Sequence, residues 1–264
     1  MRQGGRGCRA VASGTAVKTC VRLRRPTSGI PIPVRVLYVE PIMLLAKSDT
    51  ATWVTSRLSE AYLACPTKCY LLSIGEVETA NDFAIWRERR CVSYRLDGIQ
   101  RLTADHSQTI DGGELDPSRW KRALSPFALN QTVRTQNCEA YLHAVQRIHS
   151  EGTVQSAQFI PIYFVPNNKL SRPDKLTAVF GALALAKALA AKVDTAKIIH
   201  GDKGTTFRIK TNTLSRIVNK AIGQTANLLS SSSPPDLILN RHCPECGFQD
   251  RCRMKALEKD DLRV

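Results

Sequence analysis

The 264-residue chain is long enough to bury a core, and its 43% hydrophobic and 23% charged residues are ordinary for a globular protein, which excludes a disordered or fibrous chain. Its 38 Lys and Arg residues against 23 Asp and Glu give a formal charge of +15, which favours a polyanionic partner, although surface lysines also serve solubility. The sequence has no run of about eighteen apolar residues, so we expect no membrane span, no membrane partner and a cytoplasmic location.

The first 50 residues carry nine basic and two acidic side chains without an apolar period. Such a composition is typical of a transit peptide, and equally of an extension upstream of a true start at Met43. We favour the second interpretation because the pattern of a folded domain begins near Trp53. We therefore predict a basic tail, disordered or from a misassigned start, over residues 1–50, and a folded domain over residues 51–264.

The next part of the chain predicts helices. Apolar residues at helical spacing begin at Ser56, and Pro66 must kink or restart that helix. A second amphipathic helix is predicted over residues 81–102. The polar stretch 103–120, which contains Asp-Gly-Gly, is predicted to be a loop.

The second half of the chain predicts strands followed by helices. Alternating apolar residues indicate three strands, and a capped helix beginning at Ser171 follows them. A hairpin and another helix come next. The predicted ranges are strands 127–135, 139–148 and 158–166, helix 171–191, hairpin 197–211 and helix 213–231. This order predicts an α/β domain with a mixed sheet flanked by helices.

The cysteines predict a metal centre rather than a secreted disulfide framework, because their number, nine, is odd and several are clustered. Cys243, Cys246 and Cys252 form a C-x2-C-x5-C array, a spacing typical of metal or cluster ligands. A fourth ligand is required from elsewhere. The candidates are Cys65 and Cys69, at the predicted break between two helices.

Other soft ligands are weaker candidates. His242 adjoins Cys243, and neighbouring side chains usually point in different directions. The remaining cysteines are predicted to be isolated thiols: Cys8, Cys20, Cys91 and Cys138.

The sequence resembles the iron-sulfur branch of the RecB-like nucleases, which belong to the PD-(D/E)xK superfamily and include CRISPR-associated RecB-like exonucleases. The resemblance covers residues 53–262. It depends on four sequence segments: EAYLACPTKCYLLSIGE, QFIPIYFVPNNKLSRPDKL, KIIHGD and SPPDLILNRHCPECGFQDRC. It implies a restriction-endonuclease-like core that ends in a cysteine knuckle at residues 243–252.

The resemblance also implies the cofactor. Cys65, Cys243, Cys246 and Cys252 would hold a 4Fe-4S cluster, with Cys69 as the alternative to Cys65. Zn²⁺ is the alternative to the cluster, because four thiolates suit both. The role of either would be structural, since the centre would tie together segments that are distant in the sequence.

The family's catalytic motif, a carboxylate followed by (D/E)-x-K that binds Mg²⁺ or Mn²⁺, fits poorly. Gln146 stands where the first acid is expected, and the strand 158–166 has no acid. Either the site is eroded or its ligands have moved, in which case Glu139, Lys169 and Asp174 are the nearest suitable residues. Each also has an ordinary explanation, as a solvated strand residue, a turn residue and a helix N-terminal charge.

These observations leave two functions open. One is a divalent-metal-dependent DNA nuclease, a hydrolase stabilised by a 4Fe-4S cluster, with an intact or eroded site. The other is a non-catalytic nucleic-acid-binding module with a structural iron-sulfur or zinc site. Relatives continue into a ribonuclease-H-like domain, so we expect the chain to be a truncated member. The sequence does not indicate an oligomeric state.

Overall fold

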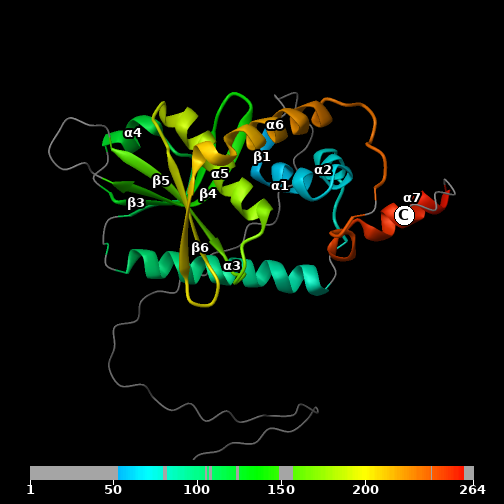
Figure 1. The fold of residues 1–264 in the computed structure, drawn as a ribbon, viewed down its shortest axis with the longest axis horizontal. Helices are drawn as coiled ribbons and strands as arrows, with labels where there is room; N and C mark the ends of the chain where they lie inside the picture. Colours follow the sequence, from blue (N-terminus) through cyan, green and yellow to red (C-terminus); the bar gives the residue numbers. More distant parts are fainter. Residues whose placement is uncertain are drawn as a thin grey trace, which may run out of the picture. The chain divides into compact units, whose positions relative to one another are not determined.

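The computed structural model describes residues 53–79, 82–104, 106, 109–122, 125–148, 157–238 and 240–258 (Figure 1). All of these lie in one compact unit. The tail predicted over residues 1–50 lies outside the described residues, as do Cys8, Cys20 and Met43 within it. In the part of the chain that is described, no helix has the length and apolar character needed to cross a membrane.

A seven-stranded mixed sheet organises the described residues. Strands β3, β4 and β5 form an antiparallel meander, β6 returns parallel to β5, and β7 is antiparallel to β6. At the other edge β2 is parallel to β3, and β1 pairs with β4. The strands are β1 (Val54–Thr55), β2 (Thr109–Asp111), β3 (Phe127–Arg134), β4 (Cys138–Ile148), β5 (Gln158–Val165), β6 (Thr195–His200) and β7 (Thr205–Lys210). The predicted α/β class with a mixed sheet is confirmed.

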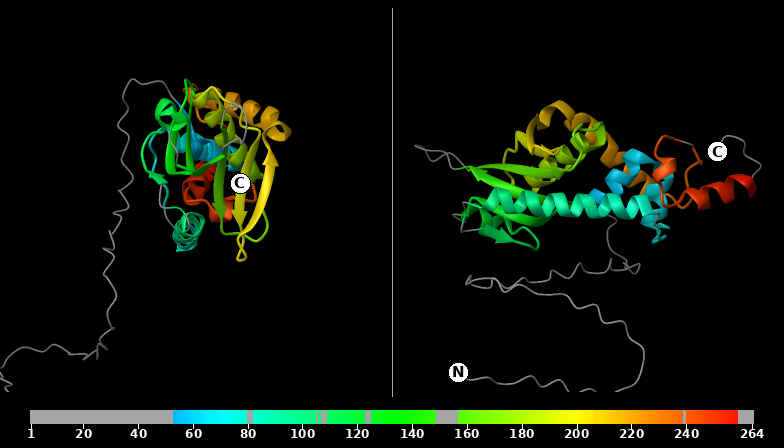
Figure 2. Two further views of the ribbon diagram at one scale, coloured as in Figure 1. Left: turned by 90° about the vertical axis from the view of Figure 1, so that its left-hand side faces the viewer. Right: turned by 90° about the horizontal axis from the view of Figure 1, so that it is seen from below.

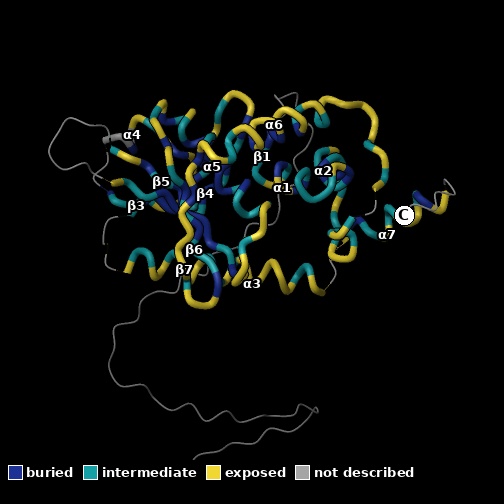
Figure 3. The backbone as a smooth tube through the Cα atoms, in the orientation of Figure 1, coloured by how far each residue is buried: buried dark blue, intermediate teal, exposed yellow. Residues whose placement is uncertain are grey.

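Helices cover both faces of the sheet (Figure 2). Helices α1, α5 and α6 contribute to the larger core on one face, whereas α3 packs on the other face against a smaller cluster. The helices are α1 (Ser56–Ala64), α2 (Pro66–Ser73), α3 (Asp82–Thr103), α4 (Pro117–Arg122), α5 (Arg172–Leu189), α6 (Thr211–Leu229) and α7 (Gln249–Glu258), with a 3₁₀ turn, η1, at Cys243–Glu245. Buried positions concentrate in the central strands and α5 (Figure 3).

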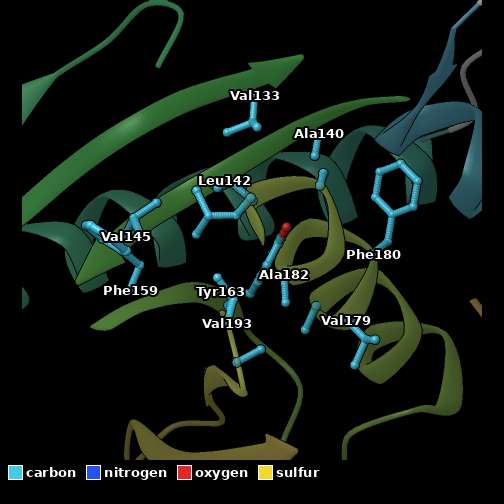
Figure 4. Close-up of a cluster of buried hydrophobic side chains, with 14 of the residues drawn as sticks. Val133, Ala140, Leu142, Val145, Phe159, Tyr163, Val179, Phe180, Ala182 and Val193 are labelled. Carbon is cyan, nitrogen blue, oxygen red and sulfur yellow. The ribbon is translucent and has the colours of Figure 1, made fainter. Parts of the chain in front are cut away.

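Helix α5 forms the centre of the larger core. A capping box begins it, in which the Ser171 hydroxyl accepts from the Asp174 amide and the Asp174 carboxylate accepts from the Ser171 amide, so two otherwise unpaired N–H groups are satisfied. Val179 and Phe180 of this helix belong to the same buried hydrophobic cluster as Leu142 of β4 (Figure 4). The predicted helix 171–191 is therefore confirmed, apart from its terminal residues.

The predicted break at Pro66 is also confirmed. Helix α1 ends at Ala64, Cys65 is extended with φ −165° and ψ 119°, and α2 begins at Pro66. Proline suits the first position of a helix because its missing N–H has no intrahelical acceptor there. The break leaves Cys65 as the single residue between two helices.

The prediction of a loop over residues 103–120 is wrong in part. Thr109–Asp111 forms β2 against β3, and Pro117–Arg122 forms α4. Trp120 of α4 is buried beside Phe159, with ring centroids 4.8 Å apart. Neither element is long enough to show a period in the sequence, and tertiary packing stabilises both.

Candidate metal centre and sheet-face cleft

The structure brings the α1–α2 junction next to the C-terminal cysteine segment (Figure 1). Asn240 links the two. Its side-chain amide donates to the Ala64 carbonyl at 3.3 Å, next to Cys65, and its backbone N–H donates to the Cys243 sulfur at 3.3 Å. Its side-chain oxygen accepts from the His242 N–H at 2.8 Å. One asparagine thus fixes the position of Cys243 relative to Cys65.

A second connection lies on the other side of the cysteine segment. The Gly247 carbonyl accepts from both the backbone N–H and the hydroxyl of Thr79, each at 2.9 Å. A Cβ atom added to Gly247 would lie 2.7 Å from the Cβ of Glu78 and 3.0 Å from the Thr79 carbonyl oxygen. Only glycine allows this close approach, because any side chain would separate the two backbones.

Two ion pairs reinforce the same contact. Arg251 of α7 pairs with Glu76 at 2.8 Å, and Arg87 of α3 pairs with Glu245 of η1 at 2.8 Å. Both are partly exposed, so each contributes less than about 1 kcal/mol. They orient the segment more than they stabilise it.

Four thiols are electrostatic neighbours at this junction. Burial raises the pKa of Cys252, and the thiols of Cys246, Cys65 and Cys243 raise it further. Burial also raises the pKa of Cys246, which a hydrogen bond from the Phe248 backbone lowers and Cys65 raises. Like charges act this way only at short range. The structure therefore gathers Cys65 with the C-terminal trio.

Cys69 differs from these four. It is fully buried, and burial followed by the neighbouring Cys65 thiol raises its pKa to about 12. Cys69 is thus more deeply buried than the four thiols at the junction, as is common for a cysteine in a protein core. Cys138 is buried in the sheet, and Cys91 is exposed on α3. His242 lies in the turn before η1, where its side-chain Nε2 is 3.4 Å from Nε of Arg241.

The donor set fits the group that the resemblance implies. It consists of four half-exposed thiols, of which Cys243 and Cys246 each accept a hydrogen bond from a backbone N–H. Among the described residues, no group of three or more Cys, His, Asp or Glu side chains is placed so that it could hold a metal ion.

The three catalytic candidates lie on different elements, and we find no interaction joining them within the described residues. Glu139, on β4, pairs with Arg134 of β3 at 2.8 Å. Asp174 belongs to the capping box of α5. Lys169 is exposed in the loop between β5 and α5. Each local environment agrees with the ordinary structural explanation of that residue.

A cleft of about 520 Å³ lies instead on the sheet face that α3 covers. It runs across four adjacent strands, since Ile162 of β5 is in register with Lys197 of β6, and Lys197 with Arg208 of β7. The Lys197 ammonium donates to the Gln146 side-chain oxygen at 2.5 Å. The cleft is lined by Leu102, Gln146, Ile162, Lys197, Ile199, Thr206 and Arg208.

The cleft has a basic lining. Among its described lining residues there is no carboxylate, and its two charges are those of Lys197 and Arg208. Burial lowers the pKa of Lys197, and the Arg208 charge lowers it further. Sequence reasoning identified Gln146 and missed both cations. The available signal was that both cations lie within the predicted hairpin 197–211. Only the strand order places that hairpin near β4.

His143 of β4 links that strand to β5 through its side chain. Its Nδ1 accepts from the Phe164 backbone N–H at 3.0 Å, across the β4–β5 pairing. The ring stacks on Phe164 and lies near Tyr141 and Tyr163. Part of the residue still reaches solvent, yet desolvation by these rings, followed by the Arg95 charge, lowers the pKa of His143 to about 3.

Comparisons with known proteins add little to this geometry. No family model and no curated protein matches the chain. Among solved structures, the chain is similar to the one titled "Crystal structure of SSO0001", with 12% identity and a TM-score of 0.38 over 79% of this chain and 89% of that chain. The likeness is too distant to support a statement about function.

Proposed function

We propose that this chain is a nucleic-acid-binding module on a RecB-like nuclease fold, in which the site that relatives use for a catalytic metal binds a phosphate of the nucleic acid instead. The sheet-face cleft carries this proposal. Gln146 occupies the position where the resemblance places the first acid, and Ile162 belongs to the strand expected to supply the second. Lys197 and Arg208 complete the lining.

The chemistry of these side chains favours an anion. Mg²⁺ and Mn²⁺ need several oxygen ligands, chiefly carboxylates, and two nearby cations repel them. A phosphate accepts charge-assisted hydrogen bonds from lysine and arginine. The formal charge of +15 adds the long-range attraction that nucleic-acid binding uses. DNA is the proposed ligand because the relatives named above are DNA nucleases.

The strand order is compatible with the proposed restriction-endonuclease-like core. The meander β3–β4–β5 is followed by α5 and by β6, which is parallel to β5. In this arrangement β4 and β5, the strands expected to carry the catalytic motif, lie side by side at the centre of the sheet. The strand positions proposed to have lost their acids would therefore be neighbours in space.

The four cysteines are proposed to hold a structural cofactor, with a 4Fe-4S cluster preferred over Zn²⁺. Cys65 would supply one ligand from the α1–α2 junction, and Cys243, Cys246 and Cys252 the other three. Such a centre would cross-link the start of the fold to its end. An absorption spectrum recorded anaerobically, with iron and zinc analysis of the purified chain, distinguishes the two. Neither metal at stoichiometric amounts would exclude both.

The phosphate site is tested by binding rather than by cleavage alone. Lys197→Met should weaken binding to a labelled DNA oligonucleotide, and the slope of log affinity against log salt should fall by about 1, because one phosphate contact is lost. Arg208→Met should act in the same direction. Fluorescence anisotropy over a salt series in EDTA measures both quantities.

Lys192→Met is the matched control, because the Lys192 side chain is 84% exposed and pairs with the surface carboxylate of Asp194. It removes the same charge away from the cleft and should leave the salt slope nearly unchanged. Cleavage of DNA by the wild-type chain that requires Mn²⁺ or Mg²⁺ and stops in EDTA would overturn the proposal. Equal losses for the two lysine variants would also overturn the assignment of the cleft.

A further inference from the structure

Helix α3 exposes an aromatic pair that the sheet-face cleft does not use. Over its 22 residues only Gly98 is fully buried, whereas Phe83 and Trp86 are 47% and 53% exposed. Their rings lie 5.8 Å apart between centroids at an angle of 33°. Large aromatic side chains are seldom left in water without a partner to cover them.

Arginines hold this pair in place. The Arg90 guanidinium lies over the Trp86 ring, 5.5 Å from its centroid, and donates to the Pro166 carbonyl at 3.1 Å. Arg87, one turn after Phe83, is fixed by its ion pair with Glu245. The rings and cations are therefore ordered in advance, which reduces the entropy lost when a ligand binds.

The same face of α3 continues toward the cleft. Positions three, four and seven apart on a helix share one face, so Phe83, Trp86, Arg90, Tyr94 and Arg101 form one stripe. Arg101 lies over the Tyr94 ring at 6.0 Å, and the next residue after it, Leu102, lines the cleft. Asp97 is the acidic residue on this stripe. The stripe therefore combines aromatic and cationic side chains, and its last member precedes Leu102, the residue of α3 that lines the cleft.

We propose that Phe83 and Trp86 form a stacking platform for the bases of single-stranded nucleic acid, with the arginines of the stripe beside its phosphates. Exposed aromatics interleaved with arginine are the pattern by which single strands are bound without sequence preference. Charge complementarity selects this ligand over an apolar protein surface, because guanidinium groups border the rings on the helix. The inference rests on the proposed function and adds the strand state of its ligand.

The test compares three ligands and three proteins by fluorescence anisotropy. Trp86→Ala should weaken binding to a single-stranded DNA oligonucleotide roughly tenfold, as expected for the loss of one stacked base, while Trp86→Phe should recover most of the affinity. An abasic oligonucleotide of equal length should bind the wild type and Trp86→Ala equally. A blocked duplex should show a smaller dependence on Trp86, because its bases are already stacked.

Leu257→Ala is the matched control. Leu257 is 77% exposed on α7, so the change removes an exposed apolar side chain away from the stripe, and affinity should not change. Equal affinities of wild type and Trp86→Ala for the normal oligonucleotide would overturn the platform, as would an equal loss with the abasic one. Concentration-dependent self-association in light scattering that Trp86→Ala abolishes would also overturn it, since the platform would then bind a second copy.

Failure of the platform differs from failure of the proposed function. If Lys197→Met weakens binding and Trp86→Ala does not, the phosphate site stands and the platform fails. If the wild type binds neither single strands nor duplex at low salt, both fail.

Discussion

The cysteine junction and the sheet-face cleft present opposite cases. At the junction, segments from the start and the end of the fold meet, and all four side chains are thiols. In the cleft, adjacent strands contribute an amide and two cations, and the described lining includes no carboxylate. The first set of side chains suits a soft cation, whereas the second suits an anion.

The two regions also differ in how they are connected to the fold. The segment 240–258 contributes no residue to either core cluster of the sheet, although its own Phe248 and Ala256 are buried. Hydrogen bonds of Asn240 and Thr79 and partly exposed ion pairs connect it to the rest of the fold. The cleft lies on strands that the two cores already stabilise. A change at the junction should therefore loosen the segment 240–258, whereas a change of a side chain that lines the cleft should leave the two cores of the sheet in place.

The largest expected effect separates Cys65 from Cys69. Cys65→Ala should abolish bound metal and destabilise the chain by several kcal/mol, because metal binding and folding are coupled at a site of this kind. Cys69→Ala should keep the metal and cost about 1 kcal/mol, since it removes only a buried sulfur atom. Metal content by elemental analysis and thermal unfolding measure the two effects. Retention of metal by Cys65→Ala and its loss from Cys69→Ala would reverse the ligand assignment.

The second effect tests the junction without touching a sulfur. Gly247→Ala places a Cβ 2.7 Å from that of Glu78, so the backbone contact with Thr79 must open, at a cost of about 1–3 kcal/mol. Gly223→Ala is the matched control, because a Cβ there meets nothing within 4 Å on α6 and should stabilise the helix by roughly 0.5–1 kcal/mol. Urea midpoints compare the two. Equal shifts would show that the junction tolerates separation.

Sequence reasoning predicted the elements whose pattern is long or chemically marked. The capping residues Ser171 and Asp174 and the alternating strands before them were sufficient for the sheet and α5. The break at Pro66 followed from proline's missing donor. The two-residue β1 and the three-residue β2 were missed because pairing with β4 and β3, rather than local propensity, makes them strands.

The candidate sites show the same division. The cysteine array was visible because its three cysteines are close in sequence, and Cys65 was visible because a proline follows it. Lys197 and Arg208 were not visible, since only their register across β6 and β7 brings them to Gln146. Glu139, Lys169 and Asp174 were suggested by residue type alone. The ion pair with Arg134 of the neighbouring strand β3 accounts for Glu139, and the capping box accounts for Asp174.

The smallest effect concerns the sheet beneath the cleft and works through pH. His143 has a pKa of about 3 in the fold and about 6.5 when unfolded, so below pH 6.5 the unfolded chain binds a proton that the fold does not. The contribution of His143 to the free energy of unfolding is fully present above pH 6.5 and is lost as the pH falls, by ~1 kcal/mol between pH 7 and 5.5.

His143→Asn, which offers an oxygen to the Phe164 N–H but does not titrate, should be less sensitive to acid by that amount. Urea midpoints of both proteins at the two pH values give the difference, from which acid effects at the cysteine junction cancel because the two proteins share it. If the two proteins lose stability equally, the acid sensitivity lies at the junction and the sheet supporting the cleft is indifferent to protonation of His143.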